Sequence, residues 1–194
     1  MLDIAFDLKG GFAPAGYAFA LWDEVVRCLP WLEAEKFAGI LPLRAAASGG
    51  NMLLPQRTKL VLRLPTGLAP QARQLSGQEL DVEGSVLRVG EAKDKPLQPH
   101  PTLHAQLVES GREEKEFLAD MESQLQEMEV ACKLICGMRH TLAGAKQSVA
   151  GYSLVLHDLK PDASLQIQRA GLGGKRRYGC GIFVPYKAIS GLGS

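Results

Sequence analysis

Apolar and polar residues alternate in several short stretches, a pattern that is typical of half-buried β-strands. The clearest stretch is Thr58–Leu64, where three leucines share one face while Lys59 and Arg63 lie on the other. Similar alternation predicts strands at 2–8, 102–109 and 151–157. Apolar residues spaced by about 3.6 residues instead predict helices, at 17–29 and 113–129.

The order of these elements predicts two similar halves. Residues 1–90 run strand, helix, strand, strand, helix, strand, and residues 95–187 repeat that order. This is the order of the ferredoxin-like fold. We therefore predict an α+β protein with two tandem ferredoxin-like halves, at 1–92 and 93–194, of which the second carries a C-terminal glycine-rich loop.

The composition is that of a globular protein. The chain has 194 residues, of which 46% are hydrophobic, so it can bury a core. It contains no run of about 18 apolar residues and no basic, apolar leader, so we expect a cytoplasmic protein without a membrane partner. Cys132, Cys136 and His140 recur every four residues but lack a fourth ligand. We therefore expect neither a metal nor a small-molecule cofactor.

The net charge of +1 conceals a strong asymmetry along the chain. Residues 133–194 contain nine Lys and Arg against two Asp, a net charge of 9 − 2 = +7. Residues 1–132 contain 13 basic and 19 acidic residues, a net charge of 13 − 19 = −6. Because a basic segment of this size attracts negative charge, the C-terminal third is predicted to bind a polyanion.

The segment 171–181 combines flexibility with positive charge. Its glycines are Gly171, Gly173, Gly174, Gly179 and Gly181, and its consecutive cations are Lys175, Arg176 and Arg177. Glycine lets backbone N–H groups turn toward a ligand, so one interpretation is a cradle for phosphates. The other is a flexible basic turn before an edge strand. The Walker pattern is absent and the loop leads into a strand, which favours a phosphate chain over a single nucleotide.

This loop and several other stretches together resemble the CRISPR-associated repeat endoribonucleases, which cut precursor guide RNA at each repeat. Within that family the chain is most similar to the small proteobacterial, Myxan-type branch. The matching stretches span nearly the whole chain in order, and the glycine-rich block is the most specific. They are Phe6–Gly10, Leu29–Leu32, Leu60–Pro65, Pro96–Leu97 with Thr102–Leu103, and Gly171–Pro185.

The resemblance implies RNA-recognition-motif-like halves that hold a CRISPR repeat hairpin. It also implies metal-independent cleavage, in which the ribose 2′-oxygen attacks the adjacent phosphate and leaves a cyclic phosphate and a 5′-hydroxyl. Such an enzyme is expected to retain its product within a CRISPR effector, whose other subunits are expected partners. The chemistry requires one group that removes a proton from the 2′-oxygen and another that protonates the leaving oxygen.

The family usually supplies a histidine near the start of the first helix, and the sequence departs from that pattern. Gly16 and Tyr17 stand where the family has Asp and His. Tyr17 is one catalytic candidate, because a phenol is a proton or hydrogen-bond donor at neutral pH; the alternative is an ordinary packing aromatic. His140, next to Arg139, is the second candidate, because histidine titrates near neutral pH. The alternatives for His140 are a phosphate contact and a solvated side chain.

The resemblance also implies contacts to RNA from the glycine-rich loop and from basic residues elsewhere. The predicted contacts are Arg57, Lys59, Arg63, Arg139, Lys146, Gly171, Gly173, Gly174, Lys175, Arg176, Arg177, Gly179 and Gly181. For Lys59 and Arg63 simple solvation is the alternative. The missing histidine leaves a second function open, that of a repeat-RNA-binding subunit with little or no cleavage. A third is a protein that binds a phosphorylated metabolite through the loop.

Overall fold

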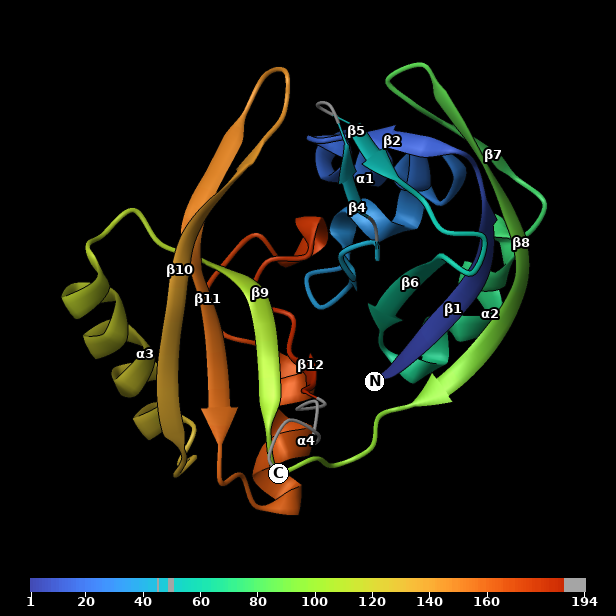
Figure 1. Cartoon of the computed structure of the whole chain (residues 1–194). Helices are drawn as coiled ribbons and strands as arrows, with labels where there is room; N and C mark the ends of the chain where they lie inside the picture. The colour runs from blue at the N-terminus through green and yellow to red at the C-terminus, as the bar shows by residue number, and fades with distance from the viewer. Residues whose placement is uncertain (45, 49–50, 187–194) are drawn as a thin grey trace, which may run out of the picture.

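The computed structural model describes residues 1–44, 46–48 and 51–186. Within these residues three antiparallel sheets pack with helices in two halves (Figure 1). The strands are β1 (Leu2–Lys9), β2 (Phe12–Pro14), β3 (Gly39–Ile40), β4 (Ala46–Ser48), β5 (Asn51–Leu53), β6 (Lys59–Leu64), β7 (Glu79–Val82), β8 (Ser85–Pro96), β9 (Leu103–Glu109), β10 (Lys133–Ala143), β11 (Ser148–His157) and β12 (Val184–Pro185). The α-helices are α1 (Tyr17–Cys28), α2 (Ala69–Ala72), α3 (Glu114–Glu127) and α4 (Pro161–Ala170), and the 3-10 helices are η1 (Pro30–Ala34), η2 (Thr66–Leu68), η3 (Arg73–Leu75) and η4 (Arg176–Tyr178).

The first half is built on a sheet with the strand order β3-β6-β1-β8-β7. The alternation predicted for β1 and β6 is confirmed, because Ile4, Phe6 and Leu62 face one core together with Leu21 and Val25 of α1. Burying these apolar side chains removes them from water and so holds the helix against the sheet. A smaller sheet, β2-β5-β4, joins the chain just before α1 to the segment before β6.

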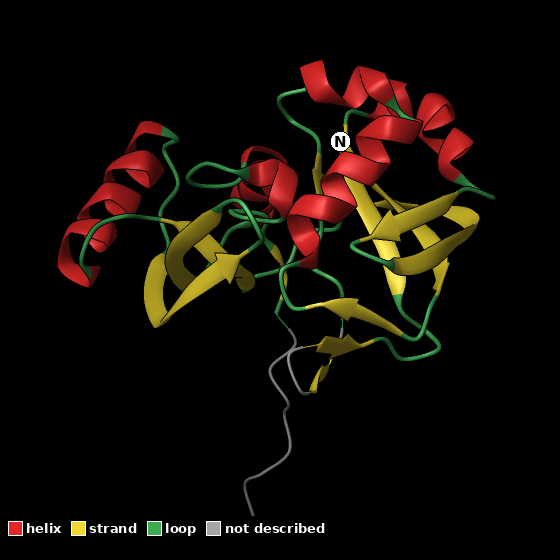
Figure 2. Ribbon diagram, turned by 90° about the horizontal axis from the view of Figure 1, so that it is seen from above, coloured by secondary structure: helices red, strands yellow, loops and turns green. Residues whose placement is uncertain are grey.

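The second half has the strand order β10-β11-β9-β12. Its elements run β9, α3, β10, β11, α4, β12, which is the predicted order of strands and helices. Phe117 and Met121 of α3 and Ile167 of α4 share a core with the buried residues of β9 and β11. Figure 2 shows α3 on the outer flank of this half, at the far left. No helix in the described ranges is long and apolar enough to cross a membrane.

Three boundaries differ from the sequence expectation. β8 continues to Pro96, so the boundary expected after residue 92 falls inside a strand whose Lys93 pairs with β1. The mainly apolar residues 130–135 predict a short strand and residues 137–141 a basic turn or strand start, but β10 is one strand. Its pairing with β11 continues through a register shift between Cys136 and Arg139. The apolar residues 182–186 predict a last strand, but β12 covers only Val184–Pro185, and the Phe183 carbonyl before it accepts a hydrogen bond from Arg63. The sequence Ser-Gly-Gly-Asn at 48–51 predicts a turn, and its residues 49 and 50 lie outside the described residues.

A separate apolar cluster joins the two halves. Phe19 of α1 packs with Leu107 of β9, Val149 of β11 and Cys180 of the glycine-rich loop. Tyr178 packs against the same cluster. The junction therefore places α1, the hairpin β10–β11 and the loop in one region of the molecule.

Candidate nucleic-acid interface

The first turns of α1 touch two segments of the second half. Gly16 lies so close to the Ala143 carbonyl that a side chain at residue 16 would overlap it. The ring of Phe19 meets that of Tyr178 edge to face, with the centroids 4.7 Å apart. The Arg177 guanidinium carbon lies 5.8 Å from the centroid of the Trp22 ring. One helix thus contacts both the end of the β10–β11 hairpin and the glycine-rich loop.

The hairpin presents His140 toward α1. His140 pairs with Gly151 across the hairpin and is exposed. Leu142 lies two residues further along β10, so it shares a face with His140, and it packs against the cluster that contains Phe19. His140 therefore lies on the side of the hairpin that faces α1, about 10 Å along the strand from Ala143. Lys146 is exposed in the turn that follows.

The glycines of the loop mainly allow backbone segments to cross closely. Gly171 has φ +71° and is buried against the Gly181 carbonyl, where a side chain would clash. Gly181 has φ +64°, and its N–H donates to the Leu107 carbonyl at 2.7 Å. Gly179 is also buried, so these three glycines face protein, and their burial does not support the predicted contact with RNA. Only Gly173 and Gly174 are exposed among the five.

Comparisons with known proteins fit this architecture. Residues 2–188 match the model of the family described as "Cas6 Crispr". The chain belongs to the Cas6 family. It is 31% identical over 186 residues to the "CRISPR-associated endonuclease Cas6" of Myxococcus xanthus (strain DK1622), covering 95% of this chain and 81% of that protein.

Solved structures show that the Cas6 fold is shared by distant relatives. A structure titled "Characterization of a Cas6-related gene from Pyrococcus furiosus" has a TM-score of 0.67 at 12% identity, covering 94% of this chain and 97% of the other. A structure of Thermus thermophilus Cse3, "bound to an RNA representing a pre-cleavage complex", has a TM-score of 0.54 at 13% identity, covering 94% and 97%. At such identities the likeness concerns the fold alone.

The Cas6 chain keeps Tyr17 away from solvent. The side chain is 8% exposed, and its hydroxyl accepts a hydrogen bond from the Leu43 N–H at 2.7 Å. Burial raises the pKa of Tyr17 to about 12, although the bond from Leu43 opposes the shift. A buried phenol that is already used by the backbone is not placed to exchange a proton with RNA. Tyr17 is therefore a packing aromatic in this structure, and the geometry gives no support to its predicted catalytic role.

Replacing Tyr17 by Phe is expected to leave cleavage by a Cas6 enzyme unchanged within about threefold, because no proton passes through the phenol. The free energy of unfolding should fall by about 1–3 kcal/mol, since the buried Leu43 N–H loses its acceptor.

The stability contributed by Tyr17 is expected to depend on pH, because its folded pKa of about 12 exceeds the unfolded value of 10. The stabilising contribution is thus complete below pH 10 and is lost as the pH rises toward 12. Urea titrations of both proteins across that range measure it; hundredfold slower cleavage by Tyr17→Phe would return Tyr17 to the mechanism.

His140 differs from the other three histidines. Nδ1 of His100 lies 2.7 Å from the Thr102 carbonyl oxygen, and Nδ1 of His157 lies 3.0 Å from the Thr102 hydroxyl. His104 packs beside an aromatic ring, and burial lowers the pKa of its imidazole. In the described part of the chain the His140 ring has no hydrogen-bond partner. His140 is therefore the histidine whose ring is available to a ligand.

Two of the predicted RNA contacts are internal. Arg63 is 1% exposed, and its guanidinium donates to both carboxylate oxygens of Asp3, at 2.6 and 2.9 Å. It also donates to the carbonyls of Gln168 and Phe183 in the second half. Arg176 donates to the Phe37 carbonyl at 2.8 Å and to the Ala170 carbonyl at 3.3 Å.

Both arginines therefore tie the two halves together. Burial lowers the pKa of Arg176 to about 10, and the nearby charge of Arg63 adds to that shift. The donors of Arg63 and Arg176 bond to protein carbonyls and a carboxylate, so the geometry does not support their predicted phosphate contacts. Neither the alternation of apolar and basic residues in a strand nor the composition reveals hydrogen-bond partners more than 100 residues away along the chain.

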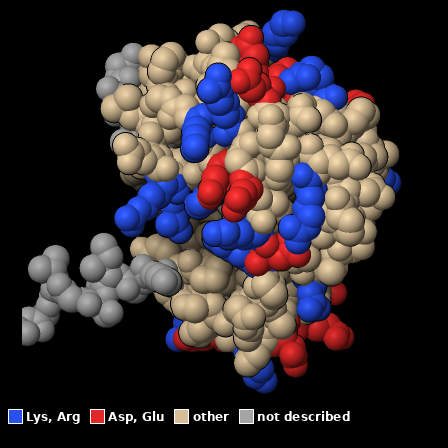
Figure 3. All heavy atoms as spheres, turned by 90° about the vertical axis from the view of Figure 1, so that its right-hand side faces the viewer, with Lys and Arg blue, Asp and Glu red and all other residues tan. Residues whose placement is uncertain are grey.

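The remaining predicted cations are exposed, with different partners. Lys175 and Arg177 lie on the loop, and Arg57 lies in the turn before β6. Lys59 forms an ion pair with Asp7, and Arg139 is 3.3 Å from Glu113. Figure 3 views the right-hand side of Figure 1 and shows cations interspersed with carboxylates rather than one basic face. Arg177 of the loop and Lys146 of the hairpin turn add exposed positive charge to the segments that contact the first turns of α1.

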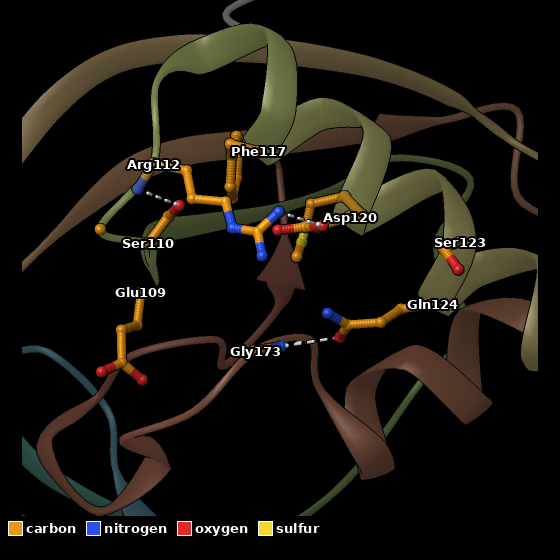
Figure 4. A pocket seen from close by; sticks show the side chains of 10 residues that line it. Glu109, Ser110, Arg112, Phe117, Asp120, Ser123, Gln124 and Gly173 are labelled. Carbon is orange, nitrogen blue, oxygen red and sulfur yellow. Dashed lines mark hydrogen bonds and ion pairs between the residues drawn. The ribbon is translucent and has the colours of Figure 1, made fainter.

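The loop borders two hollows of opposite character. The first, of about 420 Å³, lies against α3 and contains Glu109 and Asp120 (Figure 4). Arg112 is 3.4 Å from Asp120, and the Gly173 N–H donates to Gln124 at 3.0 Å. The two carboxylates against one arginine disfavour a phosphate on this side of the loop. In the described residues, moreover, no cluster of three or more His, Cys, Asp or Glu is placed to hold a metal ion.

The second hollow lies on the other side of the loop and was not predicted. Residues 35–38, which follow η1, form its opposite wall. The isolated Lys36 and Phe37 have no partner nearby in the sequence that would mark a site. Only the fold brings them to the glycine-rich loop, more than 130 residues later.

Proposed function

We propose that this chain is a metal-independent endoribonuclease that binds the CRISPR repeat hairpin and cuts precursor guide RNA. The 2′-oxygen attacks the adjacent phosphate and leaves a cyclic phosphate and a 5′-hydroxyl, after which the protein retains the product in an effector with other CRISPR subunits. The observation that carries the proposal is the convergence of His140, the hairpin and the cationic loop around α1. The activity named for the Myxococcus xanthus relative supports it.

The same proposal assigns both halves to the ferredoxin-like, RNA-recognition-motif-like fold. The support is the strand order, because β1 lies between β6 and β8 in the first sheet and β9 lies between β11 and β12 in the second. In each half the first strand thus lies in the middle of its sheet. The second half, 97–186, shows the complete order of strands and helices. The joint between the halves then begins after Pro96 rather than at residue 92.

In this proposal His140 is the proton-transfer group. Its exposed ring lies on the α1 side of the hairpin and is available to take the proton of the 2′-hydroxyl or to protonate the leaving oxygen. Lys146 is exposed in the turn of the same hairpin, and Lys175 and Arg177 are exposed on the loop that contacts α1. These cations supply positive charge for the phosphate backbone and for the charged intermediate. Further phosphate contacts come from Arg57, Lys59 and Arg139. Of these, Lys59 must first release Asp7, and Arg139 must first release Glu113.

The test is single-turnover incubation with the cognate repeat hairpin in excess EDTA. A parallel substrate carries hydrogen in place of the 2′-hydroxyl before the cut. Cleavage of the first RNA alone, with a cyclic phosphate on the product, is the expected result. Cleavage of both RNAs, or a requirement for added metal, would overturn the proposed chemistry.

A second function is favoured by one observation, the burial of Tyr17 where the family pattern places a histidine. Because residue 17 is then unavailable to the RNA, the chain would bind repeat RNA as a subunit and cut it slowly or not at all. Tight, salt-dependent binding without cleavage in the same assay distinguishes this function. A metabolite-binding protein would bind neither RNA in a salt-dependent manner.

Charge reversal on the loop is expected to weaken binding of the hairpin RNA. Lys175→Glu and Arg177→Glu should each raise the Kd by about tenfold or more, because charge-assisted phosphate contacts contribute about 1.5–3 kcal/mol. Each should also reduce the slope of log Kd against log salt by about 1. Arg88→Glu, an exposed cation on β8, is the matched control. Equal losses in all three proteins would point to net charge rather than to the loop.

A further inference from the structure

The second hollow beside the glycine-rich loop holds an exposed aromatic residue. The space is about 500 Å³, which is within the range of ligand sites, and Phe37 lies in its wall with 58% of its surface exposed. Its backbone is fixed from both sides. The Phe37 N–H donates to Glu35 at 2.8 Å, and the Phe37 carbonyl accepts from Arg176 at 2.8 Å. The segment is therefore anchored while the residue itself remains accessible.

The charges around this hollow favour an anion. Lys36, Lys175 and Arg177 contribute three exposed cations, and Arg176 adds its charge although its donors bond to protein carbonyls. Glu35 is the one carboxylate in the lining and already accepts the Phe37 N–H. The hollow on the α3 side of the same loop has the opposite balance, with two carboxylates and one arginine. A polyanion that reaches the loop is thus attracted to the side that carries the aromatic residue.

We propose that this hollow is a subsite for one unpaired nucleotide of the RNA, with its base stacked on Phe37 and its phosphate between Lys36 and the loop cations. The proposal rests on the proposed function, because it assumes that the chain binds repeat RNA. An aromatic ring takes an unstacked base, whereas bases inside a duplex already stack on one another. The nucleotide therefore belongs to a single-stranded segment that flanks the hairpin rather than to its stem.

Stacking on an aromatic side chain accepts any base, because each base has a flat face. The subsite is thus expected to add affinity without adding sequence preference. The cations fix the strand through its phosphates, and the fixed backbone of Phe37 lowers the entropy lost on binding. Neither Lys36 nor Phe37 is needed for the proton transfer assigned to His140, so the two sites are separable.

The experiment compares three non-cleavable RNAs that carry a 2′-deoxy nucleotide before the cut: the hairpin alone, the hairpin with a 5′ flank and the hairpin with a 3′ flank. Each flank contains 2-aminopurine, whose fluorescence is quenched by stacking. Phe37→Ala should raise the Kd for one flanked RNA by about 5- to 150-fold and abolish the quenching by protein. It should leave the Kd for the hairpin alone unchanged. Phe37→Trp should retain both effects of the wild type.

Val86→Ala is the matched control, because Val86 is an exposed apolar residue on β8, at 54% exposure, outside the hollow. Equal Kd values of wild type and Phe37→Ala for both flanked RNAs would overturn the subsite. Unchanged RNA binding combined with loss of binding to other CRISPR subunits would also overturn it and make Phe37 a protein contact. Failure of the wild type to bind even the hairpin would instead reject the proposed function on which the subsite rests.

Discussion

Replacing His140 by Ala is expected to slow single-turnover cleavage of the repeat hairpin by about 10²–10⁴-fold, the usual contribution of a positioned general acid or base. The Kd for the 2′-deoxy hairpin should change by about threefold or less, because the lysines and arginines that contact the phosphates remain in place. The physical reason is position: the ring is exposed on the α1 side of the hairpin, while the Tyr17 hydroxyl is buried and bonded to Leu43. Rapid-quench assays at saturating protein measure the chemical step.

Thr141→Ala is the control for this prediction. Thr141 is the next residue on β10, is also exposed, and points to the opposite face of the sheet. Its replacement should leave both the cleavage rate and the Kd as in the wild type. Cleavage by His140→Ala at the wild-type rate would remove His140 from the mechanism. A weaker Kd with an unchanged rate at saturation would make it a phosphate contact.

The secondary structure was predictable because it depends on local periodicity. β1, β6 and α1 each bury one face, and a face is visible in the spacing of residues such as Ile4, Phe6 and Leu62. The same rule gave the order of elements in the second half. Local periodicity did not predict the full length of β10, because the polar residues after Cys136 are held in the strand by pairing with β11 rather than by burial of one face.

The site was less predictable because its residues act through distant partners. Arg63 stands at a position that looks solvated on an isolated strand, yet the second half covers it and supplies two carbonyls. Gly171 and Gly181 belong to a segment whose composition is typical of a phosphate cradle, but each is needed where two stretches of backbone cross. The basic character of the loop was predicted; which of its cations are exposed depends on the packing of the halves.

Replacing Arg63 by Met is expected to lower the free energy of unfolding by about 3–5 kcal/mol, the usual effect of breaking a buried ion pair. The change leaves the carboxylate of Asp3 without its partner, and the side chain of Asp3 is only 14% exposed. It also removes the donor from the carbonyls of Gln168 and Phe183. Urea denaturation, followed by tryptophan fluorescence and by circular dichroism, measures the loss.

Lys59→Met is the matched control, because Lys59 lies on the same strand and pairs with Asp7 of the same neighbouring strand, but in solvent. Removing that exposed pair should cost about 0–1 kcal/mol. Equal losses in the two variants would contradict the structural role of Arg63. Adding Asp3→Leu to Arg63→Met should recover part of the stability, since no uncompensated carboxylate then remains buried.

The pair of variants also separates stability from RNA contact. If Arg63 only holds the halves together, Arg63→Met should weaken RNA binding in proportion to the unfolded or separated fraction, and lower temperature should restore binding. A direct phosphate contact would instead lower the salt slope of binding at every temperature. Because the Arg63 donors meet Asp3 and two carbonyls in the second half, we expect the first result.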